Sequence, residues 1–362
     1  MNTAREGWKS DPRGDAQQAS NSPTDNTESP RWLQTAYSAA SAPRFRRYAL
    51  IYLALLILAW IGWRLLLHPP RLQERTSSEL DDLIRIRTLD PQFVPSDLAN
   101  LDADTKSQSQ KRLIIVGDVH GCRDELVRLL EKVAFKQAND HLIFVGDMIS
   151  KGPDSKGVVD LARQCSASSV RGNHEDRILR LRRMAKTGTL ATPSGKDSSK
   201  ERAERALASS LSDEQVQWLE ACPVILDIGQ VPGMGRVVVV HAGLDPGVEL
   251  EEQDLLSVMT MRTLDPDTNL PSPKKKGVKW AEVFDKQQSA LYSSLESSAE
   301  DPRSKTVTVV YGHDASSSLS IRTFTKGLDS GCVNGGELTA LVIGDGGKQS
   351  IVQVSCRDYR KS

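Results

Sequence analysis

The stretch that decides the fold is residues 112–121, RLIIVGDVHG, an apolar run that ends in Asp118 and His120. A short run rich in Ile and Val is typical of a buried strand. Four further strand candidates end in the same manner: HLIFV (141–145) before Gly146-Asp147, a short one ending at Val170 before RGNHED (171–176), RVVVV (236–240) before HAG (241–243), and TVTVVY (306–311) before GHD (312–314). These runs alternate with helical patterns, which predicts an α/β domain over 111–356.

The overall composition excludes several classes of protein. Lys and Arg number 47, as do Asp and Glu, so the net charge is zero and no global field attracts an anionic partner. No basic stripe with interleaved aromatic residues occurs, and we therefore expect no nucleic-acid partner. None of the five cysteines lies in a C-x-x-C pair, so the sequence indicates neither a zinc ribbon nor a disulfide framework. Cys122 and Cys332, close to the motifs, are interpreted as packing residues.

The chain before the domain contains a candidate membrane span. Residues 1–43 are polar and predict a disordered tail, because they contain too little apolar surface to offset the entropy of ordering. Residues 48–67, YALIYLALLILAWIGWRLLL, are long enough as a helix to cross the ~30 Å hydrocarbon core of a bilayer. A buried core helix is the alternative, but an apolar run of this length favours a membrane helix.

The charges beside the apolar run predict its orientation. Arg44, Arg46 and Arg47 precede it, and the positive-inside rule then places the tail in the cytosol. Arg64 and Arg71 at the other end act against that orientation. We expect a single-pass type II membrane protein with its domain on the lumenal side. Residues 69–110 are interpreted as a stalk, with a short helix at 78–86.

The ends of the strand candidates carry residues that suit a metal centre. In α/β proteins, side chains at the carboxyl ends of buried strands meet at one edge of the sheet. The candidate ligands for two divalent ions are Asp118, His120, Asp147, Asn173, His241 and His313. Asp147 suits the bridging position, and nitrogen and oxygen ligands without thiolate favour Zn, Mn, Fe or Co. A lone D-x-H or GNHE is usually a surface or capping motif, so the prediction depends on their joint occurrence.

A two-metal centre of this kind predicts a phosphoesterase. We expect a metal-held hydroxide to attack phosphorus in line with the leaving oxygen, while both ions neutralise the developing charge. His174, next to Asn173, is the candidate general acid. The candidate phosphate-binding cations are Lys151, Arg171 and Arg262. The run Lys274-Lys275-Lys276 is interpreted as a solvated loop rather than a grip for a polyanion.

The motifs resemble those of a known superfamily. GDVHGC (117–122), GDMISKGPDS (146–155), RGNHED (171–176), HAGL (241–244) and YGHD (311–314) are similar to the motifs of calcineurin-like metallophosphoesterases. Within them the chain resembles the branch of the serine/threonine phosphatases and bacterial symmetrical diadenosine tetraphosphatases, over about residues 111–345. The resemblance implies a two-sheet β-sandwich flanked by helices. It assigns Asp118, His120 and His313 to one metal, Asn173 and His241 to the other, Asp147 to both, and His174 to acid catalysis.

Two positions depart from the protein phosphatases of this branch. Those enzymes usually carry Asp-Arg where this chain has Ser150-Lys151. The Asp supports the catalytic histidine and the Arg binds phosphate, whereas Lys151 keeps the charge but loses the two-pronged grip of a guanidinium. The Asp is also absent from many diadenosine tetraphosphatases, so the departure argues against a protein phosphatase.

The apolar span and the GDMISKGPDS motif together resemble the fungal vacuolar zinc-dependent endopolyphosphatases. That resemblance implies zinc, a domain in the vacuole lumen, and hydrolysis of the phosphoanhydride bonds of inorganic polyphosphate. Such a substrate predicts an open basic groove over the metals. The alternatives are a phosphomonoesterase acting on phosphoproteins and a dinucleoside polyphosphate hydrolase. A non-catalytic membrane-tethered binding module is disfavoured by the complete set of ligands.

Overall fold

The structure, a computed structural model, describes residues 83–95, 111–190, 197–297 and 301–361, with parts of 47–60. The chain divides into two compact units, 1–74 and 75–362. In the first unit residues 47–48, 50–57 and 60 are helical, and their large apolar side chains are exposed. No helix within the described residues is long and apolar enough to cross a membrane. The rest of the predicted span, including 61–67, and the predicted tail 1–43 lie outside the described residues.

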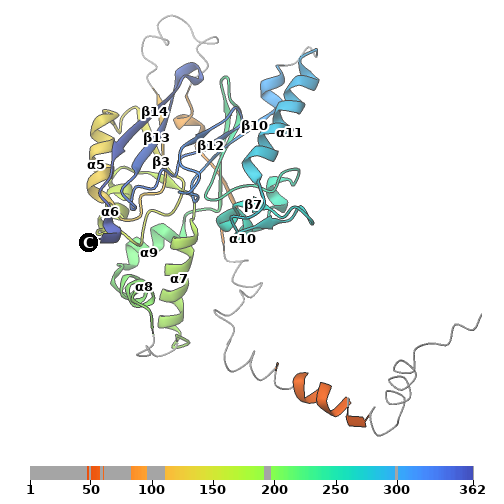
Figure 1. The fold of residues 1–362 in the computed structure, drawn as a ribbon. Coiled ribbons are helices and arrows are strands. Elements are labelled where there is room, and N and C mark those ends of the chain that lie inside the picture. The colour runs from red at the N-terminus through yellow and green to blue at the C-terminus, as the bar shows by residue number, and fades with distance from the viewer. Residues whose placement is uncertain are drawn as a thin grey trace, which may run out of the picture. The chain divides into compact units, whose positions relative to one another are not determined.

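The second unit is built on two mixed sheets (Figure 1). The first sheet has the order β1 (Ile86–Thr88), β5 (Ile225–Val231), β6 (Gly235–Val240), β10 (Val307–Tyr311), β12 (Thr325–Gly327) and β11 (Ser320–Ile321). The second has the order β14 (Gln349–Ser355), β13 (Glu337–Gly344), β2 (Arg112–Val116), β3 (Asp140–Phe144) and β4 (Ser168–Ser169). Within them β2, β3 and β4 run parallel, as do β6, β10 and β12. The five predicted strands are thus confirmed.

The two sheets pack face to face, as the strand pattern requires. Successive side chains of a strand point to opposite faces. Leu113 and Ile115 of β2 share one buried cluster with Val237 and Val239 of β6, which forms the interior of the sandwich. The alternate residues of β2 join a second cluster with the helices on the outer face of their sheet. The alternate residues of β6 belong to a third cluster with α10 and α11. The predicted α/β fold of mixed sheets and helices is confirmed.

Helices cover both outer faces, with α5 beside β13 and β14 and α11 beside β10 and β12 (Figure 1). The helices are α5 (Arg123–Lys132), α6 (Ser155–Gln164), α7 (Asn173–Lys186), α8 (Ser199–Ser210), α9 (Asp213–Glu220), α10 (Leu255–Thr260) and α11 (Trp280–Leu295). Short 3-10 turns occur at Pro91–Phe93, Leu250–Glu252, Pro302–Lys305, Asp345–Gly347 and Tyr359–Lys361. A small third sheet, in the order β8 (Pro271–Ser272), β7 (Thr263–Leu264) and β9 (Val278–Lys279), lies between α10 and α11 in the sequence.

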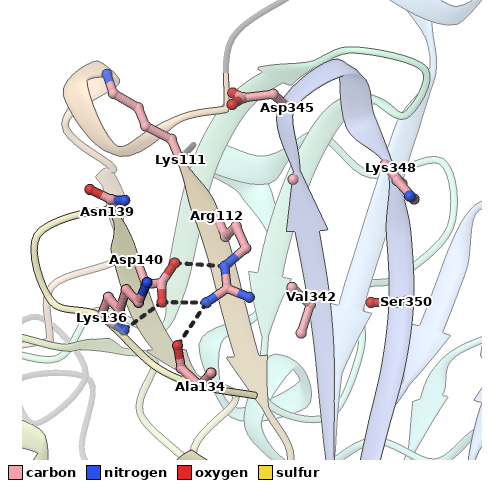
Figure 2. Close-up of a pocket in the computed structure, with 11 residues that line it drawn as sticks. Lys111, Arg112, Ala134, Lys136, Asn139, Asp140, Val342, Asp345, Lys348 and Ser350 are labelled. Carbon is pink, nitrogen blue, oxygen red and sulfur yellow. Dashed lines mark hydrogen bonds and ion pairs between the residues drawn. The ribbon is translucent and has the colours of Figure 1, made fainter. Parts of the chain in front are cut away.

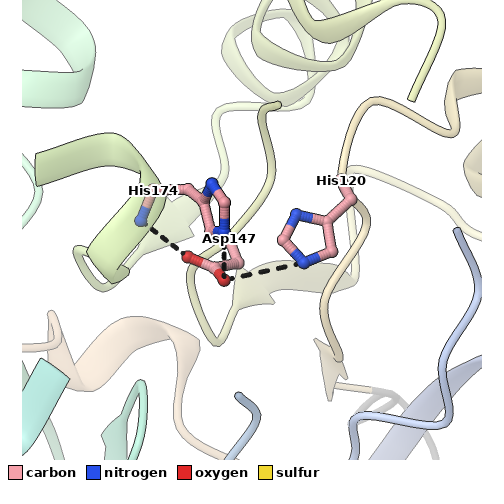
Figure 3. A group of neighbouring side chains, drawn as sticks. All are labelled: His120, Asp147 and His174. Carbon is pink, nitrogen blue, oxygen red and sulfur yellow. Dashed lines mark hydrogen bonds and ion pairs between the residues drawn. The ribbon is translucent and has the colours of Figure 1, made fainter. Parts of the chain in front are cut away.

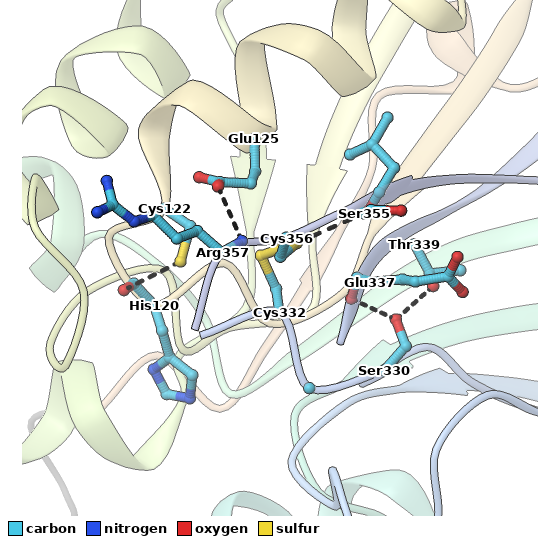
Figure 4. The surroundings of a disulfide bond; sticks show 12 residues. His120, Cys122, Glu125, Ser330, Cys332, Glu337, Thr339, Ser355, Cys356 and Arg357 are labelled. Atoms are coloured by element: carbon cyan, nitrogen blue, oxygen red, sulfur yellow. Dashed lines mark hydrogen bonds between the residues drawn. A yellow bond between two sulfur atoms is a disulfide. The ribbon is translucent and has the colours of Figure 1, made fainter. Parts of the chain in front are cut away.

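Two interpretations from the sequence need correction. Residues 83–95, expected in the stalk, belong to the sandwich unit: β1 pairs in parallel with β5, and Leu83 and Leu89 are buried. The stalk prediction failed because a three-residue strand is too short to show an alternating pattern. The second correction concerns Cys332, which forms a disulfide with Cys356 instead of only packing (Figure 4). Cys122, Cys165 and Cys222 are free thiols.

Candidate metal centre

All six predicted ligands follow carboxyl ends of strands in the two sheets, and backbone hydrogen bonds join the loops that carry them. The His120 N–H donates to the Asp147 carbonyl oxygen at 2.8 Å, which links the loops after β2 and β3. The His313 N–H donates to both carboxylate oxygens of Asp118 at 3.1 Å, which links the two sheets. The sandwich therefore brings together residues that are up to 195 positions apart in the chain.

The two carboxylate oxygens of Asp147 face different histidines. Oδ2 lies 3.6 Å from His120 Nε2 and 3.9 Å from His174 Nε2 (Figure 3). Oδ1 lies 3.3 Å from His241 Nε2. A carboxylate with one oxygen on each side has the geometry that a bridge between two cations needs. Asp147 is buried, with 2% of its surface exposed, so this charge is held away from water.

The second group of donors surrounds His241. Its Nε2 lies 3.0 Å from Asn173 Oδ1 and 3.1 Å from His313 Nδ1. The ligand atoms therefore form two compact clusters that share Asp147, one with His120 and His174 and the other with His241 and His313. The resemblance grouped His313 with Asp118 and His120 instead. The structure brings the six residues together but places the His313 ring beside His241.

Three histidines are oriented by backbone carbonyl groups behind them. The ring nitrogens bound to carbonyl oxygens are His120 Nδ1 to Ile149 (3.2 Å), His241 Nδ1 to Val145 (2.8 Å) and His313 Nε2 to Thr260 (3.1 Å). A carbonyl accepts only, so these nitrogens carry protons, and in the neutral rings of His120 and His313 the opposite nitrogen then has a lone pair. Such a backing hydrogen bond is the usual partner of a metal-binding imidazole. The donor set thus fits a pair of divalent cations.

The backbone at the site adopts conformations that side-chain-bearing residues usually avoid. His120, Asp147 and His313 have φ values of 49°, 50° and 72°. Such left-handed residues carry a conformational cost and concentrate at functional sites. Gly312 is needed for a different reason, since a Cβ there would lie 2.0 Å from Asp118 Oδ1. The backbone of these loops therefore adopts unfavourable conformations and close contacts that place these side chains at the site.

The electrostatics of the site favour a bound cation. Burial raises the pKa of Asp118, and the neighbouring Asp329 raises it further. Burial lowers the pKa of His241, but Asp147 and Asp118 outweigh it and bring that pKa to about 9. Burial also lowers the pKa of His120 and of His313 to about 3, so both are neutral ligands at pH 7. The His241 proton balances carboxylate charge that metal ions would otherwise balance.

Glu175 holds Asp147 in place, a role that the sequence did not reveal. Its buried carboxylate accepts the N–H groups of Asp147 (2.8 Å), Gly172 (3.0 Å) and Ile149 (3.2 Å). Burial, followed by the charge of Asp147, raises the pKa of Glu175 to about 7. Its position inside RGNHED was the only available signal, because hydrogen bonds to backbone groups leave no pattern in a sequence.

His174 differs from the three backed histidines. It lies near Asp147 Oδ2, but its Nδ1 is buried without a hydrogen-bond partner among the described residues. Ser150 Oγ is also buried without a hydrogen-bond partner among the described residues. Burial lowers the pKa of His174 to about 4. The structure thus places His174 at the site, where the Asp147 carboxylate, 3.9 Å from Nε2, raises its pKa by less than burial lowers it.

Two of the predicted cations reach the site, together with one that was not predicted. Lys151 Nζ lies 2.7 Å from His120 Nε2, and Arg262 donates to the His313 carbonyl oxygen at 3.4 Å. Lys275 is the third, because the Lys274-Lys275-Lys276 run is the turn between β8 and β9. The Thr263 hydroxyl fixes that turn by donating to the Lys274 carbonyl at 3.0 Å. Lys275 then lines one pocket with His120, Lys151, Arg262 and His313. The interpretation of this run as a solvated loop is therefore incomplete.

Arg171, predicted as a phosphate-binding cation, does not line the pocket beside His120 and His313. Only 2% of its surface is exposed, and its guanidinium donates to the carbonyl oxygens of Leu219 (3.4 Å) and Glu220 (2.7 Å). These carbonyls lie at the carboxyl end of α9, where a cation is favoured by the helix dipole. Arg171 therefore anchors α9 to the loop that carries Asn173.

Comparison with known proteins identifies the family of this chain. Residues 111–337 match the model of the calcineurin-like phosphoesterase family. The zinc-dependent endopolyphosphatase of Saccharomyces cerevisiae is 29% identical over 260 residues, which cover 64% of this chain and 76% of that protein. The symmetrical bis(5'-nucleosyl)-tetraphosphatase of Erwinia tasmaniensis is 27% identical over 282 residues, covering 67% of this chain and 97% of that protein.

A solved structure agrees with these sequence matches. The crystal structure of a protein provisionally assigned as a diadenosine tetraphosphatase is 32% identical, with a TM-score of 0.54. The match covers 75% of this chain and 98% of that one. The chain belongs to the calcineurin-like phosphoesterase family and is a metal-dependent hydrolase.

Proposed function

We propose that this phosphoesterase hydrolyses the phosphoanhydride bonds of inorganic polyphosphate. The observation that carries the proposal is the pocket of about 140 Å³ beside the ligand cluster, where Lys151, Arg262 and Lys275 converge from three separate segments. Asp314 and Asp329 also line it, and Asp314 pairs with Lys279 Nζ at 2.7 Å and lies 3.9 Å from Arg262 Nε. Several cations around one phosphate-sized space favour a substrate with several neighbouring negative charges.

The surroundings of His174 favour an anhydride over an ester. Cleavage adds a water oxygen to phosphorus and breaks the P–O bond, and the leaving group keeps the electron pair. A leaving phosphate, with a second pKa of about 6, accepts that pair readily, whereas the alkoxide of a serine needs a strong acid. Nδ1 of His174 has no hydrogen-bond partner within the described residues, and the Asp147 carboxylate, 3.9 Å from Nε2, does not offset the burial that lowers the pKa of the ring to about 4. The geometry suits a leaving group that needs little protonation.

Each residue of the site then has a role in the reaction. Divalent ions, when bound, would withdraw charge from the phosphoryl oxygens and lower the pKa of water. Asp118, His120, Asp147, Asn173, His241 and His313 would hold them, with zinc favoured by the donor set and by the zinc-dependent relative. Lys151 and Arg262 bind the phosphates, and Glu175 keeps Asp147 in register.

The alternative substrate is a dinucleoside polyphosphate, which the names of several relatives suggest. An adenine ring usually binds between aromatic or large apolar side chains. Neither pocket next to His120 and His174 is lined by Phe, Tyr or Trp in the part of the chain that the structure describes, and the larger apolar side chains in their walls are those of Leu207 and Val333. This composition supports a substrate made of phosphates alone.

We also propose that the chain is anchored by residues 48–67 and places its catalytic unit in the lumen of the vacuole. The apolar run and the arginines before it support an anchor of type II orientation. The Cys332–Cys356 disulfide supports an oxidising compartment. Extraction of membranes with alkaline carbonate should leave the chain in the pellet, and protease should degrade the catalytic unit only after the membrane is opened. Degradation in sealed vesicles would contradict this orientation.

The substrate proposal is tested with the full chain purified in detergent and supplied with Zn, Co or Mn. Long-chain polyphosphate, diadenosine tetraphosphate and a phosphopeptide are offered separately at equal phosphate concentration. We expect the largest kcat/KM for polyphosphate. Hydrolysis of the phosphopeptide or of the dinucleotide with polyphosphate left uncut would refute the proposal.

A further inference from the structure

A second and larger hollow of about 940 Å³ adjoins the site on the side of His174. Its walls come from the loop after β3, from α8 along its length and from Arg360. Lys151 lines both this hollow and the pocket beside His120. The rings of His120 and His174, one in each hollow, have centroids 4.9 Å apart, and Asp147 lies between them (Figure 3). The two hollows therefore meet at the ligand cluster.

The side chains that line the larger hollow carry an excess of positive charge. Besides Lys151 they include the exposed cations Lys156, Lys200 and Arg360. Its two acids already have partners from outside the hollow: Glu204 binds Arg177 at 2.6 Å, closer than the 3.8 Å to Lys200 in the hollow, and Asp154 lies 3.8 Å from Arg123. Neither Arg123 nor Arg177 lines the hollow, so the charge inside it remains positive. Cations at several distances from the ligand cluster suit an extended polyanion better than a single phosphate.

The disulfide holds one of these cations in position. It joins Cys332, in a loop that lines the smaller pocket, to Cys356, four residues before Arg360. The guanidinium of Arg360 also donates to the Asn334 carbonyl oxygen at 3.0 Å and pairs with Asp358. One covalent link thus connects the loop that lines the smaller pocket to the segment that carries Arg360 of the larger hollow.

We propose that the larger hollow is a binding subsite for the part of a phosphate chain that leaves on hydrolysis, with Lys156, Lys200 and Arg360 as its specificity-determining residues. The inference rests on the proposed function and adds to it a preference for long chains. A chain cut at the ligand cluster extends past Lys151 into both hollows. A short substrate occupies the cluster and its neighbouring pocket but does not reach the three cations.

The test compares tripolyphosphate with long-chain polyphosphate in the full-length protein. The variant Lys156→Ala/Lys200→Ala/Arg360→Ala should raise KM for the long chain about tenfold, since it removes three exposed cations whose individual contributions are small. Its kcat/KM for tripolyphosphate should stay within about twofold of wild type, which also shows that the variant is folded. The matched control is Lys111→Ala/Lys136→Ala/Lys348→Ala, which removes the same charge from a hollow at the other end of β2 (Figure 2). The control should leave both KM values unchanged.

Three results would overturn the inference. Equal effects of the two triple variants on KM would show a general effect of charge. Equal changes in KM for tripolyphosphate and for the long chain would show that the three cations act at the ligand cluster itself. An unchanged long-chain KM would leave the hollow without this role. If the wild-type protein hydrolysed diadenosine tetraphosphate but neither tripolyphosphate nor long-chain polyphosphate, the proposed function would be refuted, and the inference with it.

Discussion

The two ends of β2 and β3 both carry charged groups beside a hollow, but they balance those charges in different ways. At the amino end, Arg112 binds Asp140 through Nε (2.7 Å) and Nη2 (2.6 Å), and this hydrogen bonding raises the pKa of Arg112 (Figure 2). At the carboxyl end, no Lys or Arg nitrogen within the described residues lies within 4 Å of the carboxylate of Asp118 or Asp147. Imidazoles backed by carbonyls face Asp147 instead.

The difference shows which property marks a functional end of a sheet. Both ends are rich in charge, so charge alone does not distinguish them. At the amino end the chain supplies both partners of the ion pair, which stabilises the fold. At the carboxyl end the chain supplies buried carboxylates and imidazole lone pairs, and a bound cation from solution has to balance their negative charge.

The largest expected effect comes from Asp147. Asp147→Asn removes the charge shared by the two clusters, so kcat should fall by at least about a thousandfold for every substrate. Steady-state assays with polyphosphate, diadenosine tetraphosphate and a phosphopeptide measure it. Loss of activity towards only one substrate would contradict the assignment of Asp147 as the bridge.

The disulfide should be the next most sensitive feature of the carboxyl end. It closes a loop with a sequence separation of 24, and Cys332→Ser/Cys356→Ser should lower the free energy of unfolding by about 3 kcal/mol. Urea denaturation of the compact unit 75–362, with and without reductant, measures this change. An identical midpoint for oxidised and reduced wild type would show that the bond contributes no stability.

Glu175→Gln should weaken the support of Asp147 without removing a candidate ligand. An amide offers only one acceptor oxygen to three N–H groups, so we expect kcat to fall about 10- to 100-fold. The bound metal should decrease in parallel, as measured by mass spectrometry of the dialysed protein. Full activity in this variant would mean that the loop holds its shape without the carboxylate.

The smallest effect on activity should come from the opposite end of the strands. Asp140→Asn breaks the pair with Arg112 and should destabilise the fold by about 1 to 2 kcal/mol, because Arg112 is partly exposed. Its kcat/KM should remain within about twofold of wild type. If this variant lost activity as Asp147→Asn does, the contrast between the two ends would fail.

The sequence predicted the parts of this molecule that leave a local pattern. Short Val- and Ile-rich runs predicted β2, β3, β6 and β10, and glycines beside polar residues predicted which side chains meet at their ends. The strand β1 was missed, because its three residues gain their stability from pairing with β5 rather than from their own pattern.

The environment of a side chain was the part that could not be predicted. Arg171, expected to bind phosphate, donates to a carbonyl at the end of α9, and Lys275, expected in a solvated loop, lines the pocket. Whether a cation points to a helix end or into a pocket depends on tertiary packing. The support of Asp147 by Glu175 and the Cys332–Cys356 pair likewise depend on distances between segments that are remote in sequence.

The most direct test of the central claim is the metal content of the purified full-length chain. Wild type, Asp147→Asn and Asp140→Asn are dialysed against zinc and then against metal-free buffer, and the ions retained per chain are counted by mass spectrometry. The account predicts two ions for wild type and for Asp140→Asn, and at most one for Asp147→Asn. Two ions retained by Asp147→Asn, or none by wild type, would contradict it.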